Sequence, residues 1–324
     1  MAVLQIFSGN ILPLLVFVAI GYVLDIRYRM DIQSITKLTF HIIIPCFIFY
    51  SIYKAEMDPA LLHVFLFAVA LMIVIGIIGT VWCRLLGMPS DKTQAFKNGT
   101  MFSNAGNIGV ALIALVFAND PYVVNGETPY LAEAAAAATL VLVQMNMCLN
   151  TIGLYQAGMG MLTPRDALIT VLKMPVLYTL TAAFLVKLSG FDMTTTFVWP
   201  ILEACSGALV LIVMTALGMQ IHRAKFSFGD KDAWIGCFFR LIGGPACAWL
   251  LIKCWALMGY PFTNVTAQTL FIMASVPAPV NSVLFAVEFH NCEDFATELV
   301  MMSTLLSCAT MTGCIYAARI LFPV

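Results

Sequence analysis

The sequence predicts an all-α membrane protein with ten transmembrane helices in two inverted five-helix repeats. Of its 324 residues, 61% are apolar and only 10% are charged, whereas soluble domains carry about 25% charged residues. The apolar residues form runs of roughly 20, the length that crosses a bilayer as a helix. Two of these runs, at matching places in the two halves of the chain, are interrupted by glycine, asparagine or proline. Together these three observations define the fold class.

Charge and cysteine content exclude several other classes of protein. The 16 Lys and Arg nearly balance the 17 Asp and Glu, so no global field attracts nucleic acid, and the lipid bilayer is the expected surrounding. The ten cysteines are scattered and form no CxxC pair, which is typical of buried apolar residues rather than of a metal site. No basic stretch precedes the first apolar run, so we interpret that run as a membrane span.

The spans are expected to be helical because backbone groups cannot stay unpaired in hydrocarbon, and the runs lack the period-2 alternation of barrel strands. The predicted spans are, in order, residues 4–24, 35–53, 61–83, 95–118, 131–153, 167–188, 197–221, 233–257, 266–288 and 295–321. With the N-terminus outside, the outer side keeps only Lys54, Lys187, Lys253 and Arg319, and the remaining cations, Arg240 included, fall at inner loops or helix ends. By the positive-inside rule, this distribution predicts a multi-pass protein of the cell (inner) membrane with both termini on the outer side.

The chain divides into two halves of nearly equal length. We expect a first repeat over residues 1–155, a connecting loop over 156–166 and a second repeat over 167–324. Because five is an odd number of spans, the second repeat must enter the membrane with the opposite polarity. Inverted repeats of this kind are typical of secondary transporters, whose halves move to open a central site to either side.

The fourth and ninth spans contain residues that disfavour a continuous helix. The fourth carries glycines, asparagines and a serine between Asn98 and Gly109, and the ninth carries Pro277 and Pro279. Proline lacks the backbone donor and obstructs the preceding turn. We therefore expect both helices to break and to cross at the midplane, with half-helix N-termini near residues 108 and 278 facing the crossing point. Paired interruptions of this kind are the best sequence indicator of a transporter's binding site.

Half-helix N-termini favour anions, and asparagine side chains can donate hydrogen bonds to a carboxylate. The predicted substrate-binding residues are Ser103, Asn104, Gly106, Asn107, Pro277 and Asn281. No Lys or Arg lies near either break in the sequence, so we expect dipoles and amides to hold the anion, while carbonyls at the opposite half-helix ends could hold a cation. The alternative is that the glycines and asparagines serve close helix packing and interhelical hydrogen bonding.

Two ionisable residues inside predicted spans are candidates for coupling transport to an ion gradient. His41 could couple protons because histidine titrates near neutral pH, or it could be a hydrogen-bonded packing residue. Glu203 could be a proton or cation ligand, or a carboxylate at the start of a helix near the membrane interface.

Several motifs resemble the auxin efflux carrier family, which includes plant auxin exporters and bacterial permeases for malate or malonate. The motifs are KLTFHIIIP at 37–45, NAGNIG at 104–109, PILE at 200–203, PAPVN at 277–281 and AVEF at 286–289. The resemblance covers nearly the whole chain. It implies crossing fourth and ninth helices, and a scaffold with a transport domain that moves as an elevator. It also implies that Asn104 is the crossover asparagine that recognises a substrate carboxylate, and that Pro277 marks the ninth-helix break.

The sequence departs from the family pattern at two positions. Ala111 stands where the family often has proline, which suggests that the fourth helix breaks through Gly106 and Gly109 alone. His41 stands where asparagine is usual. The short central connection is similar to that of the bacterial branch.

The expected function is secondary active transport of a small organic anion, a carboxylate such as malate or malonate, by elevator-type alternating access. The alternatives are a sodium-coupled symporter of a larger amphipathic anion and a ligand-sensing receptor on a transporter scaffold. The sequence contains no HExxH, GxSxG or P-loop motif, so we expect no enzyme, no catalytic residue and no metal site. We expect no cofactor other than a coupling H+ or Na+. The expected partners are the substrate anion and the bilayer, with a homodimer left open and nucleic acid excluded.

Overall fold

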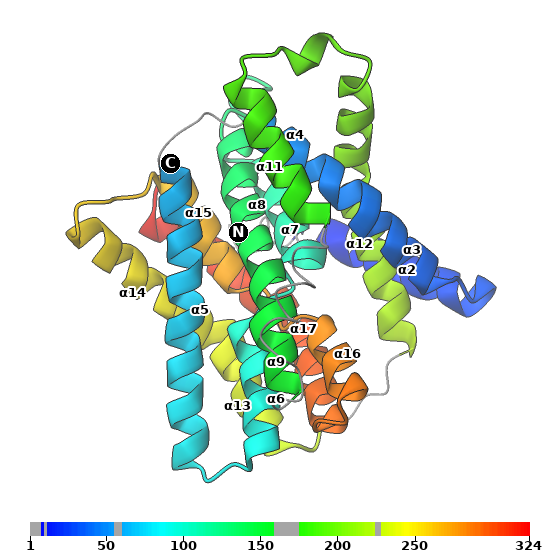
Figure 1. Cartoon of the computed structure of the whole chain (residues 1–324), viewed down its shortest axis with the longest axis vertical. Helices are drawn as coiled ribbons and strands as arrows, with labels where there is room; N and C mark the ends of the chain where they lie inside the picture. The colour runs from blue at the N-terminus through cyan, green and yellow to red at the C-terminus, as the bar shows by residue number, and fades with distance from the viewer. Residues whose placement is uncertain (1–7, 10–11, 55–59, 159–174, 224–227) are drawn as a thin grey trace.

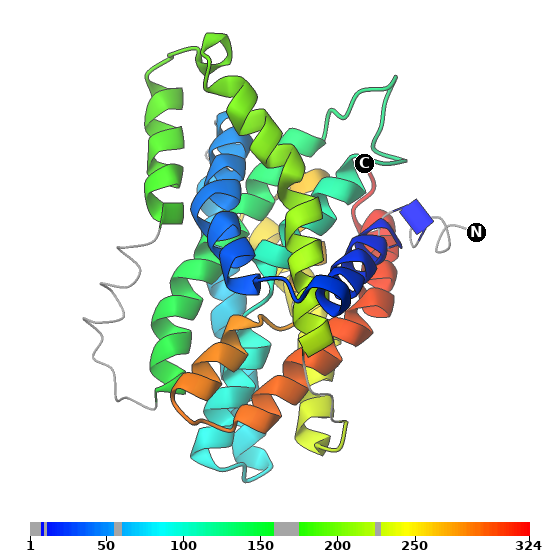
Figure 2. The same cartoon turned by 90° about the vertical axis from the view of Figure 1, so that its right-hand side faces the viewer.

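A computed structural model of the chain describes residues 8–9, 12–54, 60–158, 175–223 and 228–324. Within these ranges the protein is helical and contains no β-strand, only an isolated bridge between Val124 and Glu127. Figure 1 shows the arrangement of the helices, and Figure 2 shows it from the side. The apolar composition of the helices explains this class, because a helix satisfies its backbone hydrogen bonds within the segment.

The helices of the first half are α2 (Leu12–Tyr28), α3 (Ile32–Leu38), η2 (Thr39–Ile43), α4 (Ile44–Lys54), α5 (Ala60–Leu85), α6 (Ser90–Met101), η3 (Ala105–Gly109), α7 (Val110–Phe117), α8 (Leu131–Cys148), η4 (Leu149–Gly153) and α9 (Leu154–Ala157). Those of the second half are α11 (Pro175–Leu188), η5 (Met193–Thr195), α12 (Trp199–Arg223), α13 (Lys231–Phe238), η6 (Phe239–Gly243), α14 (Gly244–Leu257), α15 (Asn264–Ala274), α16 (Asn281–Glu288) and α17 (Glu293–Leu321). The elements η2, η3, η4 and η6 are π-helical turns that continue directly into an α-helix. Turns of this type often occur at functional sites.

Among the described residues, 6 helical stretches are long and apolar enough to cross a membrane. They are Leu61–Leu85, Ser90–Phe117, Leu131–Ala157, Trp199–Arg223, Lys231–Leu257 and Glu293–Leu321. Shorter apolar helices cover His41–Lys54 and Tyr178–Leu188. Parts of the predicted first and sixth spans lie outside the described residues. The protein is therefore a multi-pass membrane protein, while ten spans in two inverted repeats stay a prediction.

The helices form two groups that can be followed in Figure 1. In the first group, α12 packs against α2 and α4, and α11 packs against α4. The second group contains α5 to α8 and α13 to α17, which contact one another through pairs such as α5 with α8, α8 with α15 and α13 with α17. The groups meet where α4 contacts α8 and where α12 contacts η3 and α7.

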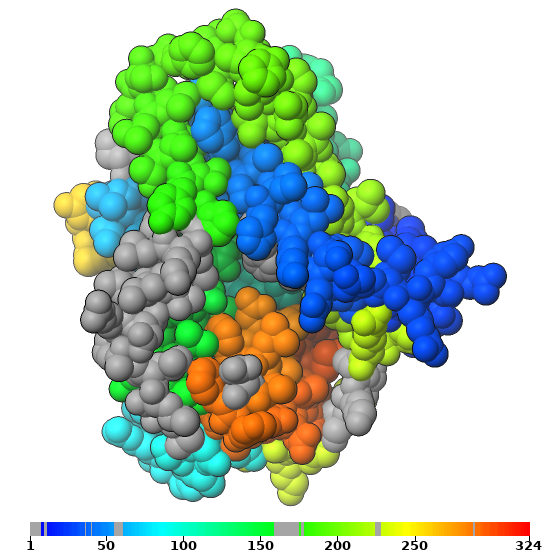
Figure 3. All heavy atoms as spheres, turned by 45° about the vertical axis from the view of Figure 1, so that its right-hand side comes forward, coloured from blue at the N-terminus to red at the C-terminus, as the bar shows by residue number. Residues whose placement is uncertain are grey.

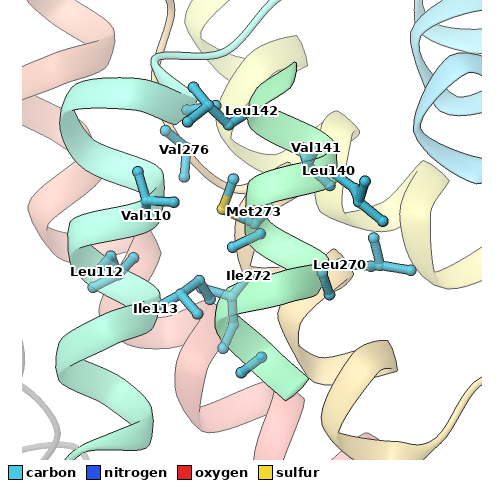
Figure 4. Packing of buried hydrophobic residues seen from close by; sticks show 14 of the residues in the cluster. Val110, Leu112, Ile113, Leu140, Val141, Leu142, Leu270, Ile272, Met273 and Val276 are labelled. Carbon is cyan, nitrogen blue, oxygen red and sulfur yellow. The ribbon is translucent and has the colours of Figure 1, made fainter. Parts of the chain in front are cut away.

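The core of the second group lies between α7, α8 and α15. Figure 4 shows the buried apolar side chains that these three helices direct toward one another. Those labelled are Val110, Leu112 and Ile113 from α7, Leu140, Val141 and Leu142 from α8, and Leu270, Ile272 and Met273 from α15, together with Val276. This packing holds the two interrupted helices against the continuous helix α8.

Both predicted helix breaks are present, but the half-helices begin at other residues than expected. The fourth helix stops at Met101, and Phe102 is extended with φ −103° and ψ 154°. Its second half begins at Ala105, before Gly106 and Gly109, which both lie inside η3. The expectation that these two glycines alone make the break is therefore wrong.

The glycines of η3 have a packing role instead. A Cβ added to Gly109 would lie 2.9 Å from the side chain of Met273, so glycine permits η3 to approach α15 closely. In the ninth helix, α15 ends at Ala274 and α16 begins at Asn281 rather than near residue 278. Two prolines in this linker remove backbone donors, and the N–H of Ala278 donates to Ser303 Oγ at 3.2 Å instead of starting a helix.

Candidate functional site

The two interrupted helices contact each other directly at their breaks. The backbone N–H of Asn104 donates to the carbonyl of Pro277 at 2.8 Å. The carbonyl of Asn104 in turn accepts from the N–H groups of Ile108 and Gly109 at 3.0 and 3.1 Å. Asn104 therefore both starts the second half of the fourth helix and joins it to the break of the ninth.

A small cavity of about 20 Å³ lies at this contact. Its lining residues are Ser103, Asn104, Ala105, Gly106, Asn107, Met145, Asn146, Leu149, Pro279, Val280 and Asn281. All the predicted substrate-binding residues except Pro277 line it, and Pro277 contributes the carbonyl that holds Asn104. Residues from the two interrupted helices, far apart in the sequence, thus meet at one place.

Three polar side-chain atoms around this cavity are buried and have no hydrogen-bond partner among the described residues. They are Ser103 through Oγ, Asn104 through Nδ2 and Asn146 through Nδ2. A buried polar group without a partner costs about 1–3 kcal/mol, and such groups are rare in native proteins. Each of the three can donate a hydrogen bond. The cavity therefore has three potential donor atoms that the described part of the chain leaves without a partner.

Sequence analysis did not identify Asn146. This residue lies on α8, a helix without a break, and it reaches the cavity only because α8 packs against α7 and η3. An asparagine within an apolar span was the available signal, because polar residues inside membrane spans are costly and usually functional.

Two larger cavities lead away from the crossover. One of about 380 Å³ shares Asn107, Val280 and Asn281 with the crossover cavity and is also lined by Lys37 and Gln220. The other, of about 750 Å³, shares Gln220 and Val280 with the first and extends along α12, α16 and α17. Figure 3 shows a hollow on this face between the blue atoms of α3 and α4 and the orange atoms of α16.

A buried arginine lies behind the crossover. Arg240, in η6, is 1% exposed, and its guanidinium donates to the carbonyls of Val276 at 2.8 Å, Thr100 at 3.0 Å and Ala274 at 2.7 Å. The expectation that no Lys or Arg lies near either break is therefore wrong, as is the placement of Arg240 among the inner-side charges. Tertiary packing brings η6 against both broken helices, which the spacing along the chain could not reveal.

The two coupling candidates lie apart from the crossover cavity. His41 is exposed, and its Nδ1 lies 3.0 Å from the carbonyl of Lys37 within the same helical stretch. Glu203 is exposed at the start of α12 and accepts a hydrogen bond from Tyr50 at 3.2 Å. Neither side chain lines the cavity. Among the described residues, no three His, Cys, Asp or Glu side chains form a group that could hold a metal ion.

Apolar spans, two broken helices in contact and a donor-rich cavity at their meeting point define a class of multi-pass membrane protein with a polar cavity between interrupted helices. The sequence pattern of a family described as "Membrane transport protein" matches residues 6–179, more than half of the chain. The chain therefore belongs to this membrane transport family, the family of the auxin efflux carriers. It is also 25% identical over 318 residues to an "Uncharacterized transporter" of Methanothermobacter thermautotrophicus, an alignment that covers 95% of this chain and 98% of that protein.

Proposed function

We propose that this protein is a secondary active transporter that moves a small organic anion across the cell (inner) membrane, with the anion bound at the crossover. The observation that carries the proposal is the group of unpartnered buried donors on Ser103, Asn104 and Asn146, all of which surround one cavity. An anion is the ligand that satisfies several donors at once and brings no donors of its own. A carboxylate has two oxygens and about four lone-pair positions, which match this set.

Half-helix ends add to the attraction. The first N–H groups of a helix have no partner inside it, so those of residues 105–107 are available at the start of η3. The helix α16 starts at Asn281, which also lines the cavity. Each helix start near an anion contributes roughly 0.3–1 kcal/mol, and more where it is partly buried. Lys37 lines the adjoining cavity and would attract a second carboxylate or guide an anion inward. We therefore favour dicarboxylates such as malonate or malate, with one carboxylate at the crossover and the other toward Lys37 in the adjoining cavity.

Alternating access would follow from the two groups of helices. The crossover belongs to the second group, whereas α12, on the other side of the adjoining cavities, belongs to the first. A movement of the second group along the first would carry the cavity across the membrane, which is an elevator mechanism. The adjoining cavities reach Lys37 and Arg223, residues that the positive-inside rule assigns to the cytoplasmic side. With that orientation, this arrangement would be the inward-open state of the proposed cycle.

The test is binding and flux in the purified protein with a panel of mono- and dicarboxylates. A ligand that binds only the folded protein raises the unfolding midpoint by mass action, and the acid that stabilises most is then used for uptake into liposomes. Asn104→Ala removes a hydrogen bond to a charged group, worth about 1.5–3 kcal/mol, so the dissociation constant should rise roughly 10- to 150-fold.

The matched control is Asn119→Ala, because the side chain of Asn119 donates to the carbonyl of Leu115, at 2.8 Å, and does not line the cavity. Its affinity and flux should equal those of the wild type. Wild-type binding and flux in Asn104→Ala would refute the site, and the absence of any carboxylate-dependent stabilisation or flux would refute the substrate class.

A further inference from the structure

The environment of Arg240 is unusual for a buried charge. Its guanidinium donates to three backbone carbonyls, and no carboxylate forms a salt bridge with it among the described residues. An unpaired buried charge is strongly unfavourable unless other groups compensate it. Something in this environment must therefore supply negative potential.

The ends of two half-helices supply it. Thr100 lies in the last turn of α6, which ends at Met101. Ala274 is the last residue of α15, and Val276 follows it in the break. The last carbonyls of a helix have no partner within the helix, and together they carry about half a negative charge. Two such ends converge on Arg240, so this place requires a cation.

The local backbone brings the guanidinium to this place. Arg240 lies in the π-helical turn η6, and Gly244, at the start of α14, lies against α15. A Cβ on Gly244 would be 2.7 Å from the carbonyl oxygen of Ala274, so only glycine permits this approach. The planar guanidinium directs fixed donors at several acceptors at once, whereas an ammonium group is a point charge. Arginine therefore fits three carbonyls from two helices.

We propose that Arg240 is the resident cation of the crossover, whose fixed charge occupies the position that a coupling Na+ would otherwise need. The half-helix carbonyls that could coordinate sodium already accept from its guanidinium, and a second cation there would be repelled. The protein therefore holds its crossover together, and transports, without Na+. The expected effect on flux rests on the proposed transport function, whereas the expected effect on stability does not.

The first test uses the wild-type protein without substrate. Its unfolding midpoint is measured in sodium, potassium and choline chloride at equal ionic strength. The midpoints should agree, because no site for a small cation remains open at the crossover. A midpoint raised specifically by Na+ would overturn the proposal. Uptake of malonate into liposomes with and without a sodium gradient provides the parallel flux measurement, and a requirement for sodium would also overturn it.

The second test replaces the charge. Arg240→Gln should lower the midpoint by roughly 5–10 °C, because hydrogen bonds from a charged group and the compensation of two helix ends are lost. Millimolar guanidinium, or Na+ at the vacated carbonyls, should restore part of this loss, whereas choline should not. Arg240→Lys keeps the charge and should stay insensitive to sodium. The matched control is Arg84→Gln, at an exposed residue in the last turn of α5. Its unfolding midpoint should respond to each of these salts as the midpoint of the wild type does.

Each outcome distinguishes the two proposals. If Arg240→Gln keeps the wild-type midpoint, or if neither guanidinium nor sodium restores it while the protein is folded, Arg240 is not the resident cation. If Arg240→Gln does not fold, the sodium insensitivity of the wild type and of Arg240→Lys decides the question. If no carboxylate is transported but the cation measurements agree with expectation, the proposed function fails and the role of Arg240 stands.

Discussion

The contact between α2 and α12 leads to the sharpest prediction about stability. A Cβ added to Gly218 would lie 1.9 Å from the carbonyl oxygen of Val18 and 2.8 Å from the backbone nitrogen of Tyr22. Ordinary contact begins at 3.4 Å, so the methyl group of Gly218→Ala is about 1.5 Å too close to a backbone that cannot rotate away. The two helices must separate, and overpacking of this kind costs about 1–3 kcal/mol.

The measurement is the thermal unfolding midpoint of the purified protein in detergent. For a chain of this size, each kcal/mol corresponds to about 2–4 °C, so Gly218→Ala should lower the midpoint by roughly 2–12 °C. Gly207 provides the control on the same helix, because a Cβ there meets nothing within 4 Å. Gly207→Ala should keep the midpoint or raise it, since alanine favours helix by about 1 kcal/mol over glycine. Equal midpoints for the two variants would refute the argument from backbone approach.

The remaining predictions concern polar contacts of the second group. Asn98 is buried and donates from Nδ2 to the carbonyl of Gly153 at 2.9 Å, so Asn98→Ala should cost about 1–3 kcal/mol of stability, and an unchanged midpoint would contradict this. Lys92 pairs with Asp230 at 2.9 Å near the surface, so Lys92→Met should cost about 1 kcal/mol or less, and the loss should shrink at high salt. Burial alone would raise the pKa of Asp230, but hydrogen bonds from Lys92 and the backbone outweigh it and lower the pKa. The stabilisation from the ionised Asp230 is therefore complete above the ordinary aspartate pKa and is lost as pH falls through the lowered value. Asp230→Asn should remove this acid-dependent part when the unfolding midpoint is measured against pH.

Local chemistry made much of the fold predictable. Long apolar runs require helices in a bilayer, and Pro277 and Pro279 lack backbone donors wherever they stand, so the break in the ninth helix follows from the sequence. The polar stretch around Asn104 indicated the other break and four of the residues that line the cavity, Ser103, Asn104, Gly106 and Asn107. The predicted starting residues of the half-helices were wrong. The true ones depend on which N–H groups find partners outside their own helix, as the N–H of Ala278 does with Ser303.

Sequence by itself determined the helical class, the membrane setting and the presence of the two breaks, because these depend on hydropathy and on backbone donors within a few neighbouring residues. Only the tertiary structure decided what surrounds the crossover. Asn146 comes from an unbroken helix, and Arg240 is 140 residues from its acceptor Thr100. Whether an arginine in an apolar run faces water or two helix ends depends on the helix packed beside it. Which helix packs there depends on the packing of the whole bundle.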